Sequence, residues 1–377
     1  CPKCFTPIYK IEGCDQMWCT QCHYAFHWKD GSFQRNFHNP HFVEYKRRNN
    51  KFLSRDPNDV ECDRSLEDAR LLDSLYEKSA QKKRTRNTTN CICRIEGTNL
   101  FVSGTNGYLE LWEFTETGDI KKKEQFFIKN EWICGMCSIP GTKEFMFCLR
   151  EEIQVWRYEK NTIVQKQILL NIAVEGFLSS VCYLPKFNLL LCGGRSHFIY
   201  YWKRNEEGQF FYSGKEKKHT AHIYYITHIP NTNIIMSGGR DNNIVMWKWQ
   251  EEKLCHYQTM ETDHESIRGI YKLPNSNRLV STCHQYVKVW EHSDDFEVME
   301  LQQNFPCYTM FFMKIENTNI FLSVGRKENS IVFWSPDEYG NLEKILNITD
   351  NDTNFYALYI PEINKIVVGN NNFKMFI

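Results

Sequence analysis

The sequence predicts a mainly β chain in three parts: a small cysteine-rich head, a charged connector with one helix, and a long body of repeated β-sheets. Three observations predict this division. Five of the 16 cysteines fall within the first 22 residues. Charged residues crowd the stretch from about 46 to 89. Beyond it, tryptophans recur every 43 to 46 residues, each at the end of a run with alternating apolar side chains.

Composition limits the classes of function. Lys plus Arg (46) equals Asp plus Glu (46), so the chain lacks the basic surface of a nucleic-acid binder. No run approaches the roughly 20 apolar residues of a membrane-spanning helix. Cysteines clustered at metal-ligand spacing or dispersed through apolar runs indicate a reducing compartment, which predicts a cytoplasmic protein without nucleic-acid or membrane partners. Because the chain begins at Cys1 without a methionine, we expect a truncated N-terminus.

The head, residues 1 to about 45, contains two CxxC pairs separated by fourteen residues, Cys1 with Cys4 and Cys19 with Cys22. Two such pairs place four thiolates around one zinc ion, and a segment this small needs the metal to fold. The sequence therefore predicts zinc as cofactor. Cys14 lies between the pairs and has no place in a complete tetrahedral site.

The series CPKC, eight residues, GC, four residues and CTQC resembles the catalytic second RING-like domain of RING-between-RING ubiquitin ligases over residues 1 to about 30. The resemblance implies that Cys14 accepts ubiquitin from a conjugating enzyme as a thioester and passes it to a substrate lysine. Ubiquitin and that enzyme would then be partners. The first RING domain and the in-between domain of that family are not present in this sequence.

Two positions depart from that family's pattern. Gln16 replaces the histidine that serves as general base, a role that His23 could take over. The family's second zinc site begins with a CxxC where this chain has His27 and Asp30, and these residues could bind a metal together with His38 and His41. We favour the alternative that the HNPH segment, residues 38–41, is a turn with solvated imidazoles.

The connector, residues 46–89, predicts one amphipathic helix. Ser65 begins a capping pattern, and apolar residues from Leu66 to Tyr76 recur at spacings of three, three and four. Basic residues follow at 78–86, where a helix dipole favours them.

The body, residues 90–377, predicts seven four-stranded repeats, the last of them incomplete. Phe376 takes the seventh position after six tryptophans: Trp112, Trp156, Trp202, Trp247, Trp290 and Trp334. One sheet cannot bury both faces alone, so the repeats should close into a ring. The seventh repeat stops after its third strand. Its fourth comes from before residue 90 or from sequence beyond Ile377, and the basic, poorly strand-like stretch before Asn90 favours a truncated C-terminus.

This period, with strands that end in tryptophan, resembles the WD-repeat family of β-propellers. In the fourth repeat His222, Ser237, Asp241 and Trp247 match the family's buried hydrogen-bonding tetrad. The resemblance implies a seven-bladed propeller that binds a protein or peptide substrate.

Arginines precede the third strand in four repeats: Arg150, Arg195, Arg240 and Arg326. On one shared rim they could bind an acidic or phosphorylated peptide, although we favour ordinary turn residues that pair with neighbouring acids or point into solvent. For the whole chain two functions stay open. One is a ubiquitin-protein transferase with a substrate-binding propeller, and the other is a non-enzymatic zinc-binding scaffold.

Overall fold

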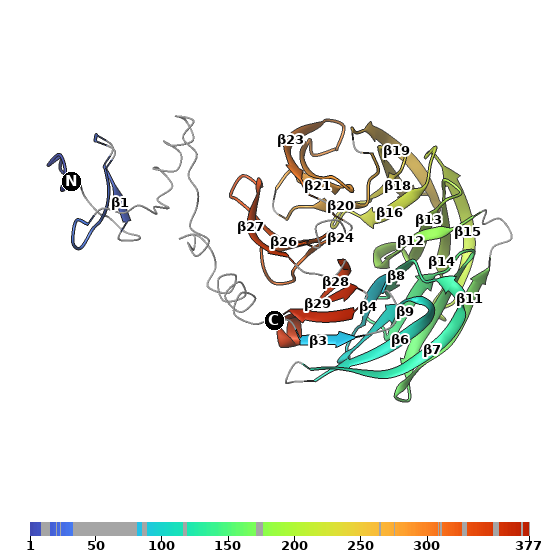
Figure 1. Cartoon of the computed structure of the whole chain (residues 1–377). Coiled ribbons are helices and arrows are strands. Elements are labelled where there is room, and N and C mark those ends of the chain that lie inside the picture. Colours follow the sequence, from blue (N-terminus) through green and yellow to red (C-terminus); the bar gives the residue numbers. More distant parts are fainter. Residues whose placement is uncertain are drawn as a thin grey trace. The chain divides into compact units, whose positions relative to one another are not determined.

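Strands form nearly all the regular structure of the described residues in the computed structural model (Figure 1). The structure describes residues 1–8, 16–19, 21–22, 24–32, 81–84, 89–115, 119–170, 176–263, 265–274, 276–307, 309, 311–325, 330–349, 354–370 and 372–376. The chain divides into two compact units, Cys1–Asp73 and Ser74–Ile377. The helix predicted near Ser65 lies outside the described residues.

In the first unit, β1 (Gln16–Trp18) and β2 (Ala25–His27) form an antiparallel hairpin. Trp18 lies opposite Ala25, and Gln16 lies opposite His27. The backbone N–H of Cys19 donates to the carbonyl oxygen of Tyr24 at 3.0 Å and closes the loop between the strands. The second cysteine pair of the head therefore lies in this loop.

In the second unit, six sheets each consist of four consecutive antiparallel strands. The first contains β4 (Cys91–Ile95), β5 (Leu100–Gly104), β6 (Asn106–Phe114) and β7 (Ile120–Trp132). The second contains β8 (Gly135–Ser138), β9 (Glu144–Cys148), β10 (Glu152–Glu159) and β11 (Thr162–Leu170). The third contains β12 (Leu178–Leu184), β13 (Leu189–Gly194), β14 (Phe198–Arg204) and β15 (Phe210–Lys217).

The next three sheets repeat this order. The fourth contains β16 (Ile223–His228), β17 (Ile234–Gly239), β18 (Asn243–Gln250) and β19 (Lys253–Glu261). The fifth contains β20 (Gly269–Lys272), β21 (Arg278–Thr282), β22 (Tyr286–His292) and β23 (Met299–Pro306). The sixth contains β24 (Phe311–Lys314), β25 (Phe321–Val324), β26 (Ser330–Pro336) and β27 (Leu342–Thr349). Short 3₁₀ turns are η1 (Pro185–Phe187) and η2 (Pro361–Ile363).

These sheets surround a common centre as the blades of a β-propeller, with the first strand of each blade innermost (Figure 1). Second strands such as β5, β13 and β17 are buried at every position, because neighbouring blades cover both of their faces. The outer strand β7 alternates between exposed and half-buried residues along most of its length. This difference explains why second strands read as unbroken apolar runs in the sequence.

A further sheet joins the two ends of the body: β28 (Asn354–Ile360), β29 (Lys365–Asn370) and β30 (Asn372–Phe376) pair with β3 (Gln81–Arg84). Its core residues Ile360 and Val367 pack with Phe101 of the first blade. On its other side, the ring of Tyr356 lies 5.1 Å from that of Phe311 in β24. The composite sheet therefore lies between the first and the sixth blade.

This arrangement corrects two expectations. Six blades are continuous in sequence where seven repeats were predicted, and the last repeat forms a four-stranded sheet only with β3. The expectation that its fourth strand lies beyond Ile377 is wrong, because the basic stretch before Asn90 supplies it: Gln81 pairs with Met375 and Arg84 with Asn372. An outermost strand needs little apolar surface and often carries lysines, so its sequence does not read as a strand.

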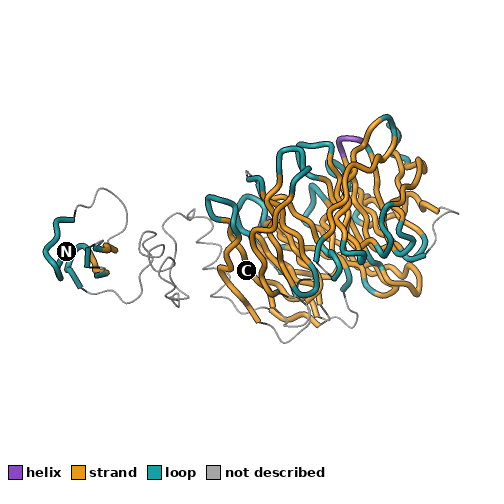
Figure 2. Tube along the Cα trace, turned by 90° about the horizontal axis from the view of Figure 1, so that it is seen from above, coloured by secondary structure: helices purple, strands orange, loops and turns teal. Residues whose placement is uncertain are grey.

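Loops gather at both ends of the propeller strands (Figure 2). Among the described residues there is no helix with the length and apolar character needed to cross a membrane.

Candidate functional site

Four thiols of the head converge on one point. The sulfur atoms of Cys1, Cys4, Cys19 and Cys22 all lie within 4.8 Å of one another. Cys1 Sγ is 3.5 Å from Cys22 Sγ, and Cys4 Sγ is 3.6 Å from Cys19 Sγ. A tetrahedral zinc site with zinc–sulfur bonds of about 2.3 Å requires sulfurs about 3.8 Å apart. The cluster therefore has the dimensions needed to hold a metal ion.

Local backbone structure positions these thiols. Cys1 and Cys4 flank a turn that is closed by a hydrogen bond from the Phe5 N–H to the Cys1 carbonyl oxygen, 3.0 Å. Hydrogen bonds from Thr6 lower the pKa of the Cys4 thiol to about 6. That thiol is therefore largely ionised at neutral pH, the form that binds metal.

The other candidate residues of the head are only partly described. His27 Nδ1 lies 3.6 Å from Asp30 Oδ1, and the same oxygen accepts hydrogen bonds from the Ser32 N–H (2.9 Å) and hydroxyl (2.7 Å). These bonds to Ser32 lower the pKa of Asp30. Cys14, His23, His38 and His41 lie outside the described residues, and so does the side chain of Gln16. The second metal site and the nucleophile thus stay predictions.

A buried hydrogen-bond network joins the loop before β16 to β17 and β18. His219 Nδ1 donates to Asp241 Oδ2 at 2.9 Å, and His219 Nε2 lies 2.7 Å from Ser237 Oγ. The indole N–H of Trp247 donates to the same hydroxyl at 2.8 Å. Burial alone would raise the pKa of Asp241, but the bonds from His219 and from the Thr220 N–H hold it below its usual value.

This network corrects the predicted tetrad in one member: the histidine is His219, not His222. Ser237, Asp241 and Trp247 take the predicted places. His222 Nε2 instead lies 3.0 Å from Ser179 Oγ, at the junction with the third blade. Sequence reasoning chose the histidine next to the strand, whereas the tetrad histidine lies three residues earlier in the loop.

A comparison with protein-family models identifies this part of the chain. The model described as "WD domain, G-beta repeat" matches residues 211–248, which include all four members of the network. The chain contains a WD repeat. A comparison with curated proteins found no match. The WD-repeat propeller is a platform for protein interactions, and its partners are proteins.

The tryptophan contacts recur in other blades of the WD-repeat propeller. The indole N–H of Trp112 donates a hydrogen bond to the Ser103 hydroxyl at 3.0 Å, and that of Trp334 donates to the Ser323 hydroxyl at 2.9 Å. In six blades the pairing between the third strand and the outer, fourth strand shifts register immediately before the tryptophan of the third strand. The periodic tryptophans are therefore structural residues of the blades.

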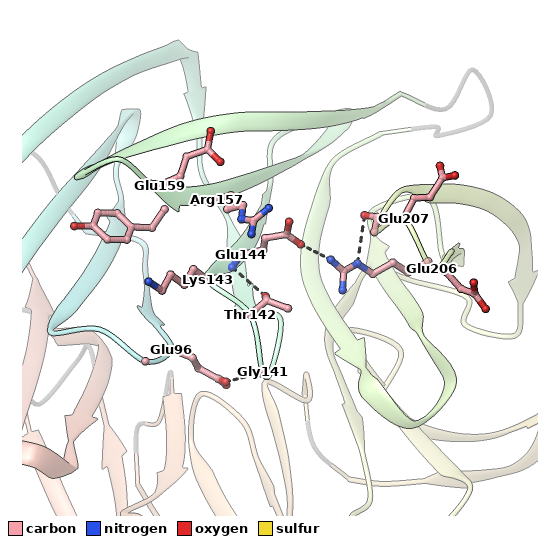
Figure 3. Close-up of a pocket in the computed structure, with 13 residues that line it drawn as sticks. Glu96, Gly141, Thr142, Lys143, Glu144, Arg157, Glu159, Glu206 and Glu207 are labelled. Carbon is pink, nitrogen blue, oxygen red and sulfur yellow. Dashed lines mark hydrogen bonds and ion pairs between the residues drawn. The ribbon is translucent and has the colours of Figure 1, made fainter.

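An open pocket of about 780 Å³ lies at the end of the propeller where the first strand of each blade turns into the second (Figure 3). It spans the first three blades and is lined by Glu96, Gly97, Gly141, Thr142, Lys143, Glu144, Arg157, Tyr158, Glu159, Arg204, Glu206, Glu207 and Gly208. Glu144 pairs with Arg204, and Glu96 accepts a hydrogen bond from the Gly141 N–H at 2.8 Å. Acidic side chains outnumber basic ones in this lining, and no pattern in the sequence predicted such a site.

The predicted arginines lie at the opposite end, in turns between second and third strands. Arg150, Arg195 and Arg240 are exposed there, whereas Arg326 lies outside the described residues. Arg150 and Arg195 share the ring of Phe177, with guanidinium carbons 4.3 and 5.9 Å from its centroid. Of the two forms of the favoured expectation, exposure to solvent fits these three arginines, whereas pairing with acids does not, because none of them forms an ion pair within the described residues.

Sequence reasoning missed Arg268 and Tyr224, which lie at the same end, with the guanidinium carbon 3.8 Å from the ring centroid. Both residues come from the first strands of blades or the loops before them, where no periodic signal marks them. Only the packing of one blade on the next brings them beside the turn arginines.

The propeller thiols have no metal-binding arrangement among the described residues. Burial raises the pKa of Cys134 to about 12 and that of Cys137 above its usual value. Both therefore stay protonated at neutral pH and lack the thiolate that binds metal.

Proposed function

We propose that this chain is a ubiquitin-transfer module, in which Cys14 of the head carries ubiquitin and the propeller binds the protein that receives it. One observation supports the proposal most. Cys1, Cys4, Cys19 and Cys22 suffice for a tetrahedral metal site, so a fifth thiol between the two pairs is not needed as a ligand. The spacing that resembles RING-between-RING ligases gives that thiol its role.

We infer that the metal is zinc, because four cysteine ligands at tetrahedral spacing suit zinc better than calcium or magnesium, which prefer oxygen ligands. Its role would be structural. It would hold the turn at Cys1–Cys4 and the hairpin loop at Cys19–Cys22 together, and so fix both ends of the segment that contains Cys14.

The proposed chemistry is two acyl transfers. The Cys14 thiolate attacks the carbonyl carbon of the thioester between ubiquitin and the conjugating enzyme, and that enzyme's thiolate leaves. A substrate lysine amine then attacks the new thioester, an amide bond forms, and the Cys14 thiolate leaves. The amine must lose a proton in this step. Gln16 cannot accept it, so we assign this role to a head imidazole, either His23 or His27, which lies opposite Gln16 in the hairpin.

The test combines the zinc-loaded chain with a conjugating enzyme already charged with labelled ubiquitin. We expect an adduct on the chain that disappears on reduction, and no such adduct with Cys14→Ala. Cys137→Ala is the matched control, because it removes a protonated propeller thiol and should leave the adduct unchanged. A chain that binds zinc but forms no adduct at any concentration of charged enzyme would contradict the proposal.

The alternative is a non-enzymatic scaffold, favoured by the WD repeat as an interaction platform. It predicts that Cys14→Ala and the unmodified chain behave alike in every assay. A partner protein that binds the propeller but never acquires ubiquitin would favour the scaffold.

A further inference from the structure

One end of the propeller has an arrangement of cations that its structural role does not explain. We define the arginine cluster as Arg150, Arg195, Arg240 and Arg268, together with the rings of Phe177 and Tyr224. The four arginines come from four consecutive parts of the ring: the turns β9–β10, β13–β14 and β17–β18, and the segment before β20. They therefore form an arc across neighbouring blades.

Among the described residues, the guanidinium groups of this cluster have no carboxylate partners. None of the four takes part in an ion pair or a side-chain hydrogen bond within the part of the chain that the structure describes. The Nε of Arg268 is buried and has no hydrogen-bond partner. Glu131 accepts a hydrogen bond from the backbone N–H of Arg150 at 3.3 Å, and not from its guanidinium group.

Arginines near the opposite end behave differently. Arg94 pairs with Glu362, Arg204 with Glu144, and Arg278 with Glu291. The chain has equal numbers of acidic and basic residues, yet among the described residues it pairs these three arginines with acids and leaves the four arginines of the cluster without one. Unpaired, converging cations are unfavourable unless a ligand supplies the missing negative charge.

The aromatic rings orient these groups for such a ligand. Arg150 and Arg195 lie over Phe177, and Arg268 lies over Tyr224. A guanidinium group that stacks on a ring uses its face, which leaves the N–H groups at its edge available for a carboxylate or phosphate.

His222 lies within the arc, with its ring 4.3 Å from that of Tyr224. Burial, followed by the charges of Arg268, Arg195, His197 and Arg240 in that order, lowers its pKa to about 4. The imidazole is therefore neutral at pH 7, and three arginines of the cluster contribute to the positive field at this position.

We propose that the arginine cluster binds an extended peptide segment carrying several carboxylate or phosphate groups. The arc spans several blades, which suits a chain of anionic groups better than one small anion. This inference rests on the propeller being the partner-binding part of the proposed function, and it names the chemical class of that partner. It does not depend on the chemistry of Cys14.

The experiment uses the full zinc-loaded chain and three fluorescein-labelled peptides of equal length. One alternates glutamate with glycine, one alternates phosphoserine with glycine, and one alternates glutamine with glycine. Fluorescence anisotropy should show binding of one or both anionic peptides, weakened by added salt, and no binding of the glutamine peptide. The stronger of the two anionic peptides identifies carboxylate or phosphate as the preferred group.

The variant Arg195→Ala/Arg240→Ala should weaken anionic peptide binding by at least about tenfold, because each removed guanidinium loses charge-assisted hydrogen bonds. Lys143→Ala/Arg157→Ala is the matched control, since it removes two exposed cations from the pocket at the opposite end. We expect its affinity to change by less than about twofold. Arg195→Lys/Arg240→Lys keeps the charge but loses the planar fork, and should give an intermediate affinity.

Several results would overturn the proposal. The glutamine peptide could bind as tightly as the anionic peptides, or Arg195→Ala/Arg240→Ala could leave the affinity for the anionic peptides unchanged. The control variant could lose as much affinity as Arg195→Ala/Arg240→Ala, or the chain could bind phosphatidylserine vesicles and neither anionic peptide. Thermal unfolding followed by circular dichroism verifies that each variant is folded. If the alanine variant does not fold, the binding of the lysine variant tests the proposal in its place. Cys14→Ala should bind the peptides normally, which separates this test from that of ubiquitin transfer.

Discussion

The head and the propeller are stabilised by different interactions. In the described head the buried apolar residues are Cys19, Ala25 and Phe26. Each continuous blade, in contrast, shares a core with its neighbours, such as the cluster around Leu191, Ile223 and Trp247 between the third and fourth blades. A small segment with so little apolar burial needs a further source of stability, and the four thiols offer one. Metal content should therefore determine the fold of one unit and leave the other unaffected.

Metal removal should give the largest effect. A structural zinc contributes roughly 10–16 kcal/mol in small zinc domains, so a strong chelator, or Cys19→Ser, should unfold the head. Hydrogen exchange measured by mass spectrometry should rise to the unprotected rate in peptides covering residues 16–32 and stay unchanged in peptides from the blades. Cys137→Ser is the control and should keep both the metal and the protection. Protection that survives chelation would show that the head folds without metal.

Head and propeller also differ in how much the sequence revealed. The spacing of the CxxC pairs predicted all four thiols of the cluster, because turn geometry and ligand geometry leave few alternatives. The tryptophan period predicted the blades, because buried second strands and alternating third strands repeat with each unit. These signals are local in the sequence, so a single chain is enough to read them.

The features that the sequence did not predict depend on the closed ring. β3 consists of the polar residues Gln81–Arg84 and becomes a strand only because β30 offers an unpaired edge. His219 lies in a loop whose length varies between repeats, so spacing alone favoured His222. Arg268 and Phe177 belong to different blades and become neighbours of the turn arginines only through the packing of one blade on the next.

The buried network of the fourth blade should contribute less than the metal but enough to measure. Ser237→Ala leaves the Trp247 N–H and the His219 ring without their shared partner, and each buried unpaired group costs about 1–3 kcal/mol. Ser323→Ala is the matched change in the sixth blade, where the hydroxyl accepts from Trp334 and has, among the described residues, one further contact, with Cys307 at 4.0 Å.

We therefore expect Ser237→Ala to lower the free energy of unfolding of the propeller more than Ser323→Ala does. Denaturant titration followed by tryptophan fluorescence measures the difference. The protection of the head from hydrogen exchange should be identical in the two variants. Equal losses would mean that His219 and Asp241 add nothing to the tryptophan–serine contact.

The smallest expected effect is a pH dependence confined to the propeller. The pKa of His222 is about 4 in the folded chain, below its ordinary value of 6.5, because of burial and the neighbouring arginines. Protonation therefore favours the unfolded state. The contribution of neutral His222 is complete above about pH 6.5 and is lost as the pH falls towards 4.

The test compares denaturant midpoints of the propeller between pH 7 and 4.5 in the unmodified chain and in His222→Asn. The variant should lose stability less steeply over this range, because it has no imidazole to protonate there. His228→Asn in the same strand is the control and should show the same change of stability with pH as the unmodified chain.

Anionic peptide binding sharpens the comparison further. A bound anion offsets the field of Arg195, Arg240 and Arg268, so it should raise the pKa of His222 towards 6.5 and make the loss of stability on acidification smaller. A pH profile that the glutamate and phosphoserine peptides both leave unchanged would mean that the anion does not reach the arginines around this histidine.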